Sequence, residues 1–190
     1  AGREYLFYSA ALLCLTGLLG VTITGDVFNV FVFMEISSLS SYILIALGRE
    51  RRALMAAFTY LIMGTIGATF LLIGIGLMYQ MTGTLNMVDM AERLQGVNDT
   101  RTIRVAVAFV VVGISTKLAV FPLHQWLPNA YSEAPPLVSA FLAATATKVA
   151  YYLLLRFSLG IFGAALVFDR IGIDTLLMPL SVLAMFVGSI

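Results

Sequence analysis

Four ionisable side chains stand in apolar stretches of the sequence, where a charge is costly. Glu35, Lys117 and Lys148 each lie deep in a long apolar run, and His124 follows Lys117 by seven residues. A charged side chain at the centre of a membrane helix costs about 2.5–3.5 kcal/mol on insertion scales, or roughly 8–10 kcal/mol for three such residues. Charged residues persist there when they face the protein interior, a partner charge or water. These four residues are therefore candidates for ion transfer within a membrane.

A carboxylate beside a buried amine can work as a proton switch. Burial disfavours the charged form of a lysine, whereas a nearby carboxylate favours it. If Glu35 approaches Lys117, the lysine holds its proton, and separation of the pair releases the proton to the next acceptor. Lys148 and His124 are the candidates for that acceptor. The chemistry fits proton transfer and needs no bond-making catalysis, so we predict no catalytic residue and no metal site.

Each of these residues also has a purely structural interpretation. A lysine can extend its ammonium group toward the lipid interface, which is difficult for Lys117 and Lys148 because both lie far inside their apolar runs. Glu35 can be a neutral, hydrogen-bonded acid, and His124 can satisfy carbonyl groups that a helix break sets free. The corresponding alternative function is a passive assembly scaffold whose buried charges only hold helices together.

Long apolar runs supply the elements that must position these residues. Hydrophobic residues make up 61% of the 190 residues and charged residues 11%, against about 45–50% and about 25% in soluble domains. Runs of about 20 apolar residues, long enough to cross a bilayer, recur along the chain. They predict an all-α integral membrane protein with spans at about Tyr5–Thr24, Val27–Gly48, Ala53–Met81, Ile103–Phe121 and Pro136–Phe157, and a sixth that begins near Asp174.

Two prolines predict an interruption in the fourth span. Proline lacks an amide hydrogen and its ring clashes with the preceding helical turn. A helix that runs through Pro122 and Pro128 should therefore break or kink, with a short second piece from His124 to about Tyr131.

Two other segments have recognisable patterns. In the third span, Gly64 and Ala68 have the spacing of small residues that lets helix backbones approach closely, so we predict a packing face there. The polar segment from Thr82 to Arg104 predicts a short amphipathic helix at the membrane interface. Its apolar face would consist of Met87, Met90 and Leu94.

Charge and cysteine content limit the partners and cofactors. The cluster of Arg49, Arg51 and Arg52 favours the cytoplasmic side for its loop, with Arg3 on the same side. A net charge of +1 argues against a nucleic-acid partner. The single cysteine, Cys14, cannot hold an iron–sulfur cluster, which needs about four thiolates, and we expect no cofactor. Because the chain begins just before a helix and stops within an apolar run, we expect a piece of a longer protein.

Several stretches resemble the antiporter-like subunits of Mrp-type cation/proton antiporters, membrane-bound hydrogenases and respiratory complex I. The D-type subunits of Mrp antiporters are the most similar, through Phe28-Asn29 and the segment Gly83–Met87. The chain is similar to this superfamily over nearly its whole length. The motifs that carry the resemblance are GDVFNVFVFME at residues 25–35, GISTK at 113–117, FPLHQWLPNA at 121–130, and residues 143–151 around Lys148.

The resemblance implies a fold and a role for each residue. Such subunits are bundles of about fourteen helices that contain two inverted five-helix repeats. Residues 1–157 would form the first repeat, with its fourth helix broken near Pro122, and residues 158–190 the connection and first helix of the second. Glu35 would be the acidic partner, Lys117 the lysine of the broken helix, His124 its histidine and Lys148 the connecting lysine. The opening helices and the second repeat, with its exit-side charged residue, are absent from the sequence.

The implied function is proton translocation by one membrane subunit of a multisubunit Na⁺/proton antiporter in a prokaryotic plasma membrane. Its partners would be other membrane subunits, the lipid bilayer, and protons, with Na⁺ as a further candidate. The equivalent subunit of complex I or of a membrane-bound hydrogenase is the alternative. A redox or quinone-binding enzyme is a third hypothesis, opposed by the lone Cys14, the single His124 and the lack of a nucleotide-binding glycine motif.

Overall fold

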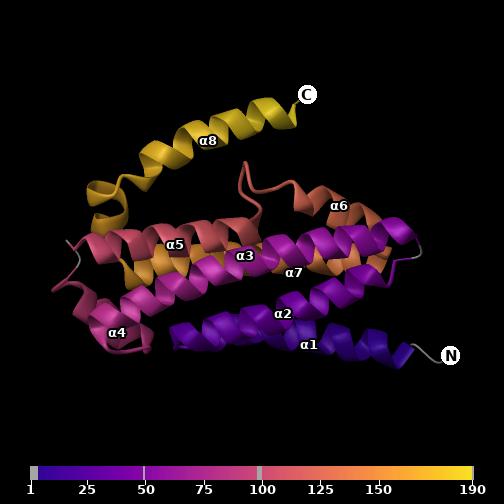
Figure 1. Cartoon of the computed structure of the whole chain (residues 1–190), viewed down its shortest axis with the longest axis horizontal. Coiled ribbons are helices and arrows are strands. Elements are labelled where there is room, and N and C mark those ends of the chain that lie inside the picture. The colour runs from indigo at the N-terminus through magenta and orange to yellow at the C-terminus, as the bar shows by residue number, and fades with distance from the viewer. Residues whose placement is uncertain (1–3, 49, 98–99, 190) are drawn as a thin grey trace.

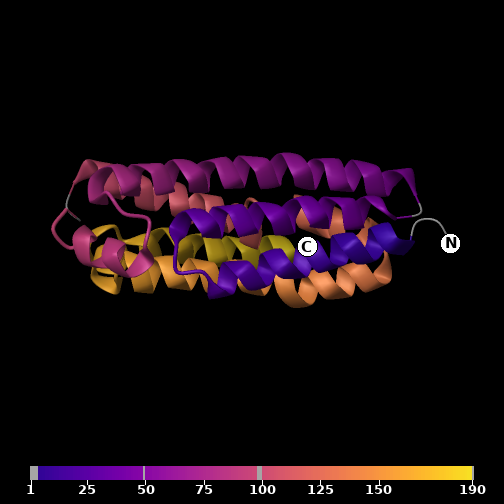
Figure 2. The ribbon, with the colours of Figure 1, turned by 90° about the horizontal axis from the view of Figure 1, so that it is seen from below.

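The long helices of the chain lie lengthwise beside one another in a bundle (Figures 1 and 2). The computed structural model describes residues 4–48, 50–97 and 100–189, so Arg3 and Arg49 lie outside the described residues. In chain order the helices are α1 Glu4–Ile23, α2 Val27–Ala46, α3 Arg51–Thr82, α4 Met87–Leu94, α5 Arg101–Leu118, α6 Trp126–Glu133, α7 Pro136–Leu155, the π-helical segments η1 Arg156–Ile161 and η2 Ala165–Arg170, and α8 Ile173–Gly188.

The predicted all-α membrane architecture is confirmed. Four helical runs are long and apolar enough to cross a membrane: α1, α2, α3, and the run from Pro136 to Ile161 that α7 and η1 form together. The last of these continues past its predicted end at Phe157. The helix α5 is less apolar because its 18 residues include Arg101, Arg104 and Lys117. Across the described ranges no strand is present, only an isolated bridge between Asp26 and Asn86.

That bridge joins two helix-starting turns at one end of the bundle. The Asp26 side chain accepts a hydrogen bond from the Asn29 amide at the start of α2, and the Asn86 side chain caps α4 in the same way. Capping by Asp or Asn satisfies amides that the first helical turn leaves without partners. The Met87 amide also donates to the Gly25 carbonyl at 2.8 Å, which holds the two turns together.

The amphipathic helix predicted in the polar segment is α4. The residues of its predicted apolar face, Met87, Met90 and Leu94, are all buried. Arg93 donates to Asp89 Oδ1 at 2.8 Å and to the Thr82 carbonyl at 3.1 Å, which fastens α4 to the C-terminus of α3. The hydrogen bond from Arg93 lowers the pKa of Asp89 below its usual value.

The interior consists of two hydrophobic clusters that are separated by a polar layer. On α2, Met34 belongs to one cluster and Tyr42 to the other. On α5, Ile114 belongs to the first cluster, while Ser115, Thr116 and Lys117 follow it as buried polar residues. The polar layer thus crosses the bundle between the two clusters, at the level of Ser37 and Ser38 on α2 and of Lys117 on α5.

Small residues bring α3 and α5 into backbone contact at this level. A side-chain carbon at Gly113 would lie 2.7 Å from both the Gly67 carbonyl oxygen and the Leu71 amide nitrogen. The packing face predicted on α3 is therefore present, with Gly67 at its centre. Gly64 also borders the polar layer, because a carbon built there would lie 3.3 Å from Lys117 Nζ.

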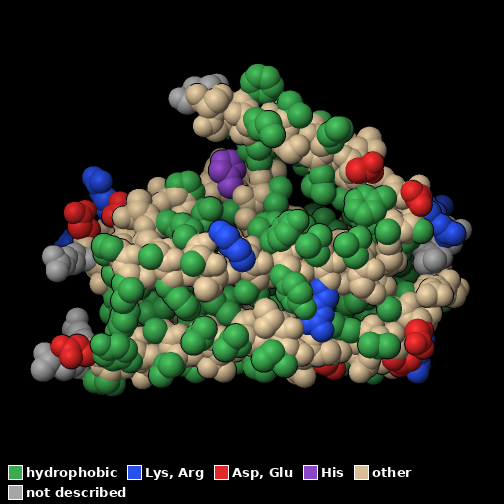
Figure 3. Space-filling model, turned by 180° about the vertical axis from the view of Figure 1, so that it is seen from behind, with side chains coloured by type: hydrophobic (Ala, Val, Ile, Leu, Met, Phe, Trp, Pro, Cys, Tyr) green, Lys and Arg blue, Asp and Glu red, His purple; other side chains and the backbone are tan. Residues whose placement is uncertain are grey.

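The outer surface of the bundle is apolar along its length. Large exposed side chains include Leu12, Phe58 and Met178. Figure 3 shows hydrophobic side chains over the length of the bundle, with most of the visible acidic side chains toward its two ends. The helix α8 stands apart from the bundle in Figure 1 and contains no buried residue. This surface is suited to contact with lipid or with further membrane helices.

We expect Gly113→Ala to destabilise the bundle by about 1–3 kcal/mol, because the added methyl group overpacks the α3–α5 contact. Thermal unfolding in detergent micelles measures the effect. Gly76→Ala is the matched control, since nothing lies within 4 Å of a carbon at that position, and it should leave stability unchanged or raise it. Equal unfolding temperatures for Gly113→Ala and the unaltered protein would contradict the packing role.

Candidate functional site

Helix α2 contributes a carboxylate and a set of serine hydroxyls to the polar layer. Ser37 and Ser38 both donate to the Met34 carbonyl, at 2.8 and 2.7 Å, and Ser41 donates to the Ser37 carbonyl at 2.7 Å. A serine that donates to its own helix in this way is satisfied as a donor and keeps lone pairs free to accept. Glu35 stands beside them, and its side chain is 25% exposed.

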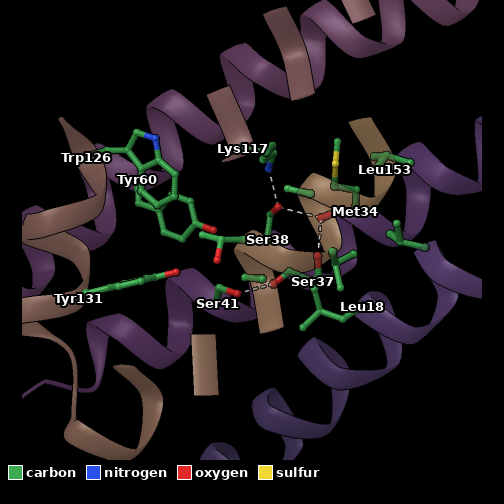
Figure 4. A pocket seen from close by; sticks show the side chains of 15 residues that line it. Leu18, Met34, Ser37, Ser38, Ser41, Tyr60, Lys117, Trp126, Tyr131 and Leu153 are labelled. Atoms are coloured by element: carbon green, nitrogen blue, oxygen red, sulfur yellow. Dashed lines mark hydrogen bonds between the residues drawn. The ribbon is translucent and has the colours of Figure 1, made fainter. Parts of the chain in front are cut away.

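Lys117 extends from the last turn of α5 into this set of acceptors. Its Nζ donates to Ser38 Oγ at 2.5 Å and lies 3.6 Å from Glu35 Oε1, and its side chain is only 6% exposed. The C-terminal end of a helix carries partial negative charge, which also favours a cation there. Figure 4 shows the Lys117 side chain directed toward Ser38.

The attraction between Glu35 and Lys117 is comparable to the cost of placing them there. At an effective dielectric constant of about 20, opposite charges at this separation attract by roughly 4–5 kcal/mol. Insertion of two charged residues costs roughly 5–7 kcal/mol, and the Ser38 hydrogen bond contributes about 1.5–3 kcal/mol more. Glu35 Oε1 is buried and has no hydrogen-bond partner among the described residues. The attraction and the Ser38 hydrogen bond therefore offset the cost of insertion, although no hydrogen bond joins Glu35 Oε1 to Lys117.

The predicted helix interruption lies immediately after Lys117. Helix α5 ends at Leu118, where Ala119 adopts a left-handed conformation with φ of 59° and its amide donates to carbonyls of the last turn. The fourth span thus ends three residues earlier than predicted, although it also begins two residues earlier, at Arg101. Pro122 lies within the break, which extends to Gln125, and the Phe121–Pro122 peptide bond is cis.

The second part of the broken helix is α6, which begins at Trp126. Pro128 lies in its first turn rather than in the break, a position where the missing amide hydrogen has no intrahelical acceptor. Trp126 Nε1 donates to the Thr116 carbonyl at 3.1 Å, and its ring stacks on Tyr60 at 4.2 Å. These contacts hold α6 against the residue that precedes Lys117.

His124 is half-buried at the break and does not contact the Glu35–Lys117 pair. Its ring lies 5.4 Å from that of Phe121, centroid to centroid. Its Nδ1 is buried and has no hydrogen-bond partner within the described part of the chain. The structure therefore brings together only two of the four predicted residues, Glu35 and Lys117.

Lys148 differs from the expectation that it lies inside the bundle. It stands at mid-length on α7, far from either end of the helix, but its side chain is exposed on the outer face. Its Nζ donates to the Ala143 carbonyl at 2.9 Å and to Thr147 Oγ1 at 3.5 Å. Helix α7 is apolar on every side, so its sequence does not reveal which face packs inward.

Several site residues were not found from the sequence. Ser37, Ser41 and Tyr60 line the polar layer, and Tyr60 also packs edge-on against Tyr42 with 4.7 Å between ring centroids. The signal for Tyr60 was available, because it follows two small buried residues, Ala56 and Ala57, at helical spacing on the packing face of α3. Among the described residues, no group of three His, Cys, Asp or Glu side chains could hold a metal ion.

Comparisons with known proteins agree with this architecture. The family model described as "NADH:quinone oxidoreductase/Mrp antiporter, TM" matches residues 24–190. The N-type subunit of the NADH-quinone oxidoreductase of Desulforudis audaxviator is 52% identical over 150 residues, which cover 79% of this chain and 30% of the relative. The D-type subunit of the Na⁺/H⁺ antiporter of Alkalihalophilus pseudofirmus is 34% identical over 186 residues, which cover 98% of this chain and 37% of the relative.

Two solved structures are similar in fold and in sequence. A chain of the archaeal membrane-bound sulfane sulfur reductase matches with a TM-score of 0.78 and 36% identity, over 88% of this chain and 33% of that chain. A chain of the Mrp complex from Dietzia sp. matches with a TM-score of 0.73 and 35% identity, over 80% and 29%. The sequence spans about a third of the length of the curated relatives it matches.

We expect Ser38→Ala to lower the free energy of unfolding by about 1.5–3 kcal/mol, because the buried Lys117 ammonium loses its hydrogen-bond acceptor. Ser40→Ala is the matched control, since Ser40 lies two residues away on α2 and donates only to the Ile36 carbonyl. Thermal unfolding of both variants in lipid nanodiscs makes the comparison. Equal effects of the two substitutions would show that Ser38 does not support the lysine.

Proposed function

Because this chain belongs to the NADH:quinone oxidoreductase/Mrp antiporter family of membrane subunits, we propose that it forms the proton-translocating part of one subunit of a multisubunit cation/proton antiporter. The observation that carries the proposal is the Glu35–Lys117 pair. The distance between Oε1 and Nζ is 3.6 Å, and the Lys117 side chain is almost fully buried in the polar layer. A buried amine with one carboxylate partner and one hydroxyl acceptor is suited to bind and release a proton.

In the proposed mechanism, Glu35 controls how tightly Lys117 holds its proton. With the carboxylate nearby, the ammonium form is stabilised by charge and by Ser38. When the Glu35 side chain turns away from Lys117, burial favours the neutral amine and the proton leaves. The absence of a hydrogen bond on Glu35 Oε1 among the described residues supports this mobility, because a fully hydrogen-bonded pair would resist separation.

His124 and Lys148 are the proposed further stations for the proton. His124 lies in the helix break and has a buried Nδ1 without a partner among the described residues. Lys148 lies at mid-length on the outer face of α7, where the continuation of the chain or another subunit can contact it. We assign residues 1–157 to a first repeat and residues 158–190 to the connection into a second.

The proposed setting is a prokaryotic plasma membrane, in which further membrane subunits cover the exposed apolar faces. The relatives are described as subunits of antiporters and of NADH-quinone oxidoreductase, which supports assembly into a larger complex. Protons are the proposed transported ion. Na⁺ would move through the assembly as a whole, because the described part of this segment shows no cluster of acidic side chains suited to bind a cation.

The equivalent role in a respiratory complex is a second candidate, favoured by the 52% identity to the N-type subunit of an NADH-quinone oxidoreductase. The two candidates share the same proton path and differ in what drives it. Proton uptake by vesicles that contain the complete assembly distinguishes them. A sodium gradient drives uptake in the antiporter, and NADH with a quinone drives it in the respiratory complex.

We expect Glu35→Gln and Lys117→Ala each to reduce proton flux by about 100-fold, the lower part of the range for a positioned proton-transfer group. The flux is measured in vesicles that carry the complete assembly, driven by a sodium gradient or by NADH with a quinone, with subunit content checked by gel. Glu92→Gln is the control, because Glu92 is exposed on α4. Normal assembly with full flux in both variants would favour the scaffold function instead.

A further inference from the structure

A buried tyrosine stands beside Lys117 with its hydroxyl unused. Tyr42 lies on α2, on the same helix face as Ser38, and is 7% exposed. A side-chain carbon at Gly64 of α3 would overlap the phenol oxygen of Tyr42 and would lie 3.3 Å from Lys117 Nζ. The phenol and the ammonium group therefore border the same small space next to Gly64. The phenol oxygen is nevertheless buried without a hydrogen-bond partner among the described residues.

The two groups that satisfy Lys117 are acceptors and match its charged form. Ser38 donates its own hydroxyl proton to the Met34 carbonyl at 2.7 Å, so it meets the lysine as an acceptor. The ionised carboxylate of Glu35 has no proton to donate. An ammonium group carries three donors and no lone pair, so these partners suit the protonated lysine.

The neutral form of Lys117 requires a partner of the opposite kind. Loss of the proton leaves a lone pair on Nζ, and a buried acceptor without a donor is unfavourable. The hydroxyls of Ser37, Ser41 and Thr116 all donate to carbonyls of their own helices. The Tyr42 hydroxyl, by contrast, keeps a proton that no described group accepts.

We propose that Tyr42 is a positioning residue that donates its phenol hydrogen to the neutral amine of Lys117 and so stabilises the lysine after its proton has left. The inference rests on the proposed function and adds the partner of the deprotonated state. A hydrogen bond to the neutral form of a group favours that form. The phenol keeps its proton throughout, and no bond at Tyr42 breaks.

Aromatic packing holds the phenol in this place. The ring of Tyr42 packs edge-on against Tyr60, with 4.7 Å between centroids, and Tyr60 stacks on Trp126 at 4.2 Å. Trp126 in turn donates to the carbonyl of Thr116, the residue before Lys117. The contacts thus form a closed circuit through α2, α3, α6 and α5. Because the circuit uses the ring of Tyr42 and not its hydroxyl, it survives removal of the oxygen.

Several helices bring titratable groups toward Tyr42 and Lys117. The small cavity of the polar layer reaches from Lys117 to Thr147 on α7, and among the described residues no titratable side chain of α7 lines it. The groups on the other helices are Cys14 on α1, Glu35 on α2, Tyr60 on α3 and Tyr131 on α6. Thiols and phenols are ordinarily uncharged at neutral pH. Glu35 is therefore the charged neighbour that a test must leave in place.

Tyr42→Phe tests the assignment, because it removes the hydroxyl and keeps the ring. Proton flux is measured as a function of pH in vesicles that carry the complete assembly, driven by a sodium gradient or by NADH with a quinone. Without its donor the neutral amine is less favourable, so Lys117 keeps its proton to higher pH. We expect the flux profile to move to higher pH by about 0.5–1 unit, the effect of one net hydrogen bond.

Tyr79→Phe is the matched control, since Tyr79 is exposed on the outer face of α3, and its profile should stay in place. An unmoved profile in Tyr42→Phe would show that the phenol does not serve the amine. A move to lower pH would show that the phenol serves the ammonium instead. Either result would overturn the proposal.

A second experiment tests the contact between the phenol and Gly64. Gly64→Ala places a methyl group where the phenol oxygen lies, so we expect a lower unfolding temperature in lipid nanodiscs. Adding Tyr42→Phe removes the overlapped oxygen and should restore part of the loss. Gly76→Ala is the control, because nothing lies within 4 Å of a carbon there. A double variant no more stable than Gly64→Ala would contradict the position of the phenol and with it the proposal.

Lys117→Ala, measured in the same vesicles, separates this inference from the function on which it rests. If Lys117→Ala abolishes flux while Tyr42→Phe keeps the pH profile of the unaltered protein, the role of Tyr42 is wrong and the proposed function stands. If Lys117→Ala retains full flux, the proposed function itself fails.

Discussion

The ammonium group of Lys117 must find partners in a bundle that otherwise offers it almost none. Two hydrophobic clusters lie on either side of it, and its side chain has little contact with solvent. Ser38 supplies a hydrogen-bond acceptor, Glu35 supplies an opposite charge, and the end of α5 supplies the negative pole of a helix. That pole exists at mid-bundle only because α5 stops at Leu118. The helix break is therefore part of the environment that stabilises the buried ammonium group of Lys117.

The looseness of the ion pair follows from the same arrangement. Glu35 approaches to 3.6 Å without a hydrogen bond, and a quarter of its side chain remains exposed. A two-pronged pair in a dry interior would be rigid, and removal of one partner would leave an uncompensated charge at a cost of about 3–5 kcal/mol. Here Lys117 also donates to Ser38, so the carboxylate is not its only polar partner.

Aromatic and small residues fix the geometry around this pair. Trp126 joins α6 to α5 through the Thr116 carbonyl and to α3 by stacking on Tyr60. Gly67 and Gly113 let the backbones of α3 and α5 touch. Neither interaction involves a charge, yet together they determine how closely α3, α5 and α6 approach one another beside the ion pair. The space that they leave open is the small cavity between Lys117 and Thr147.

Residue type and order along the chain determined the class of this protein, because apolar runs of this length are stable as helices that cross a membrane. They also identified Glu35 and Lys117 as charged residues within apolar spans, and Pro122 as a point where a helix is interrupted. The sequence did not determine which face of each helix points inward. In a membrane bundle both faces are apolar, so periodicity carries little information. Only the tertiary structure therefore decided that Lys117 is enclosed while Lys148 is exposed, and that Ser38 and Thr147 stand beside the two lysines.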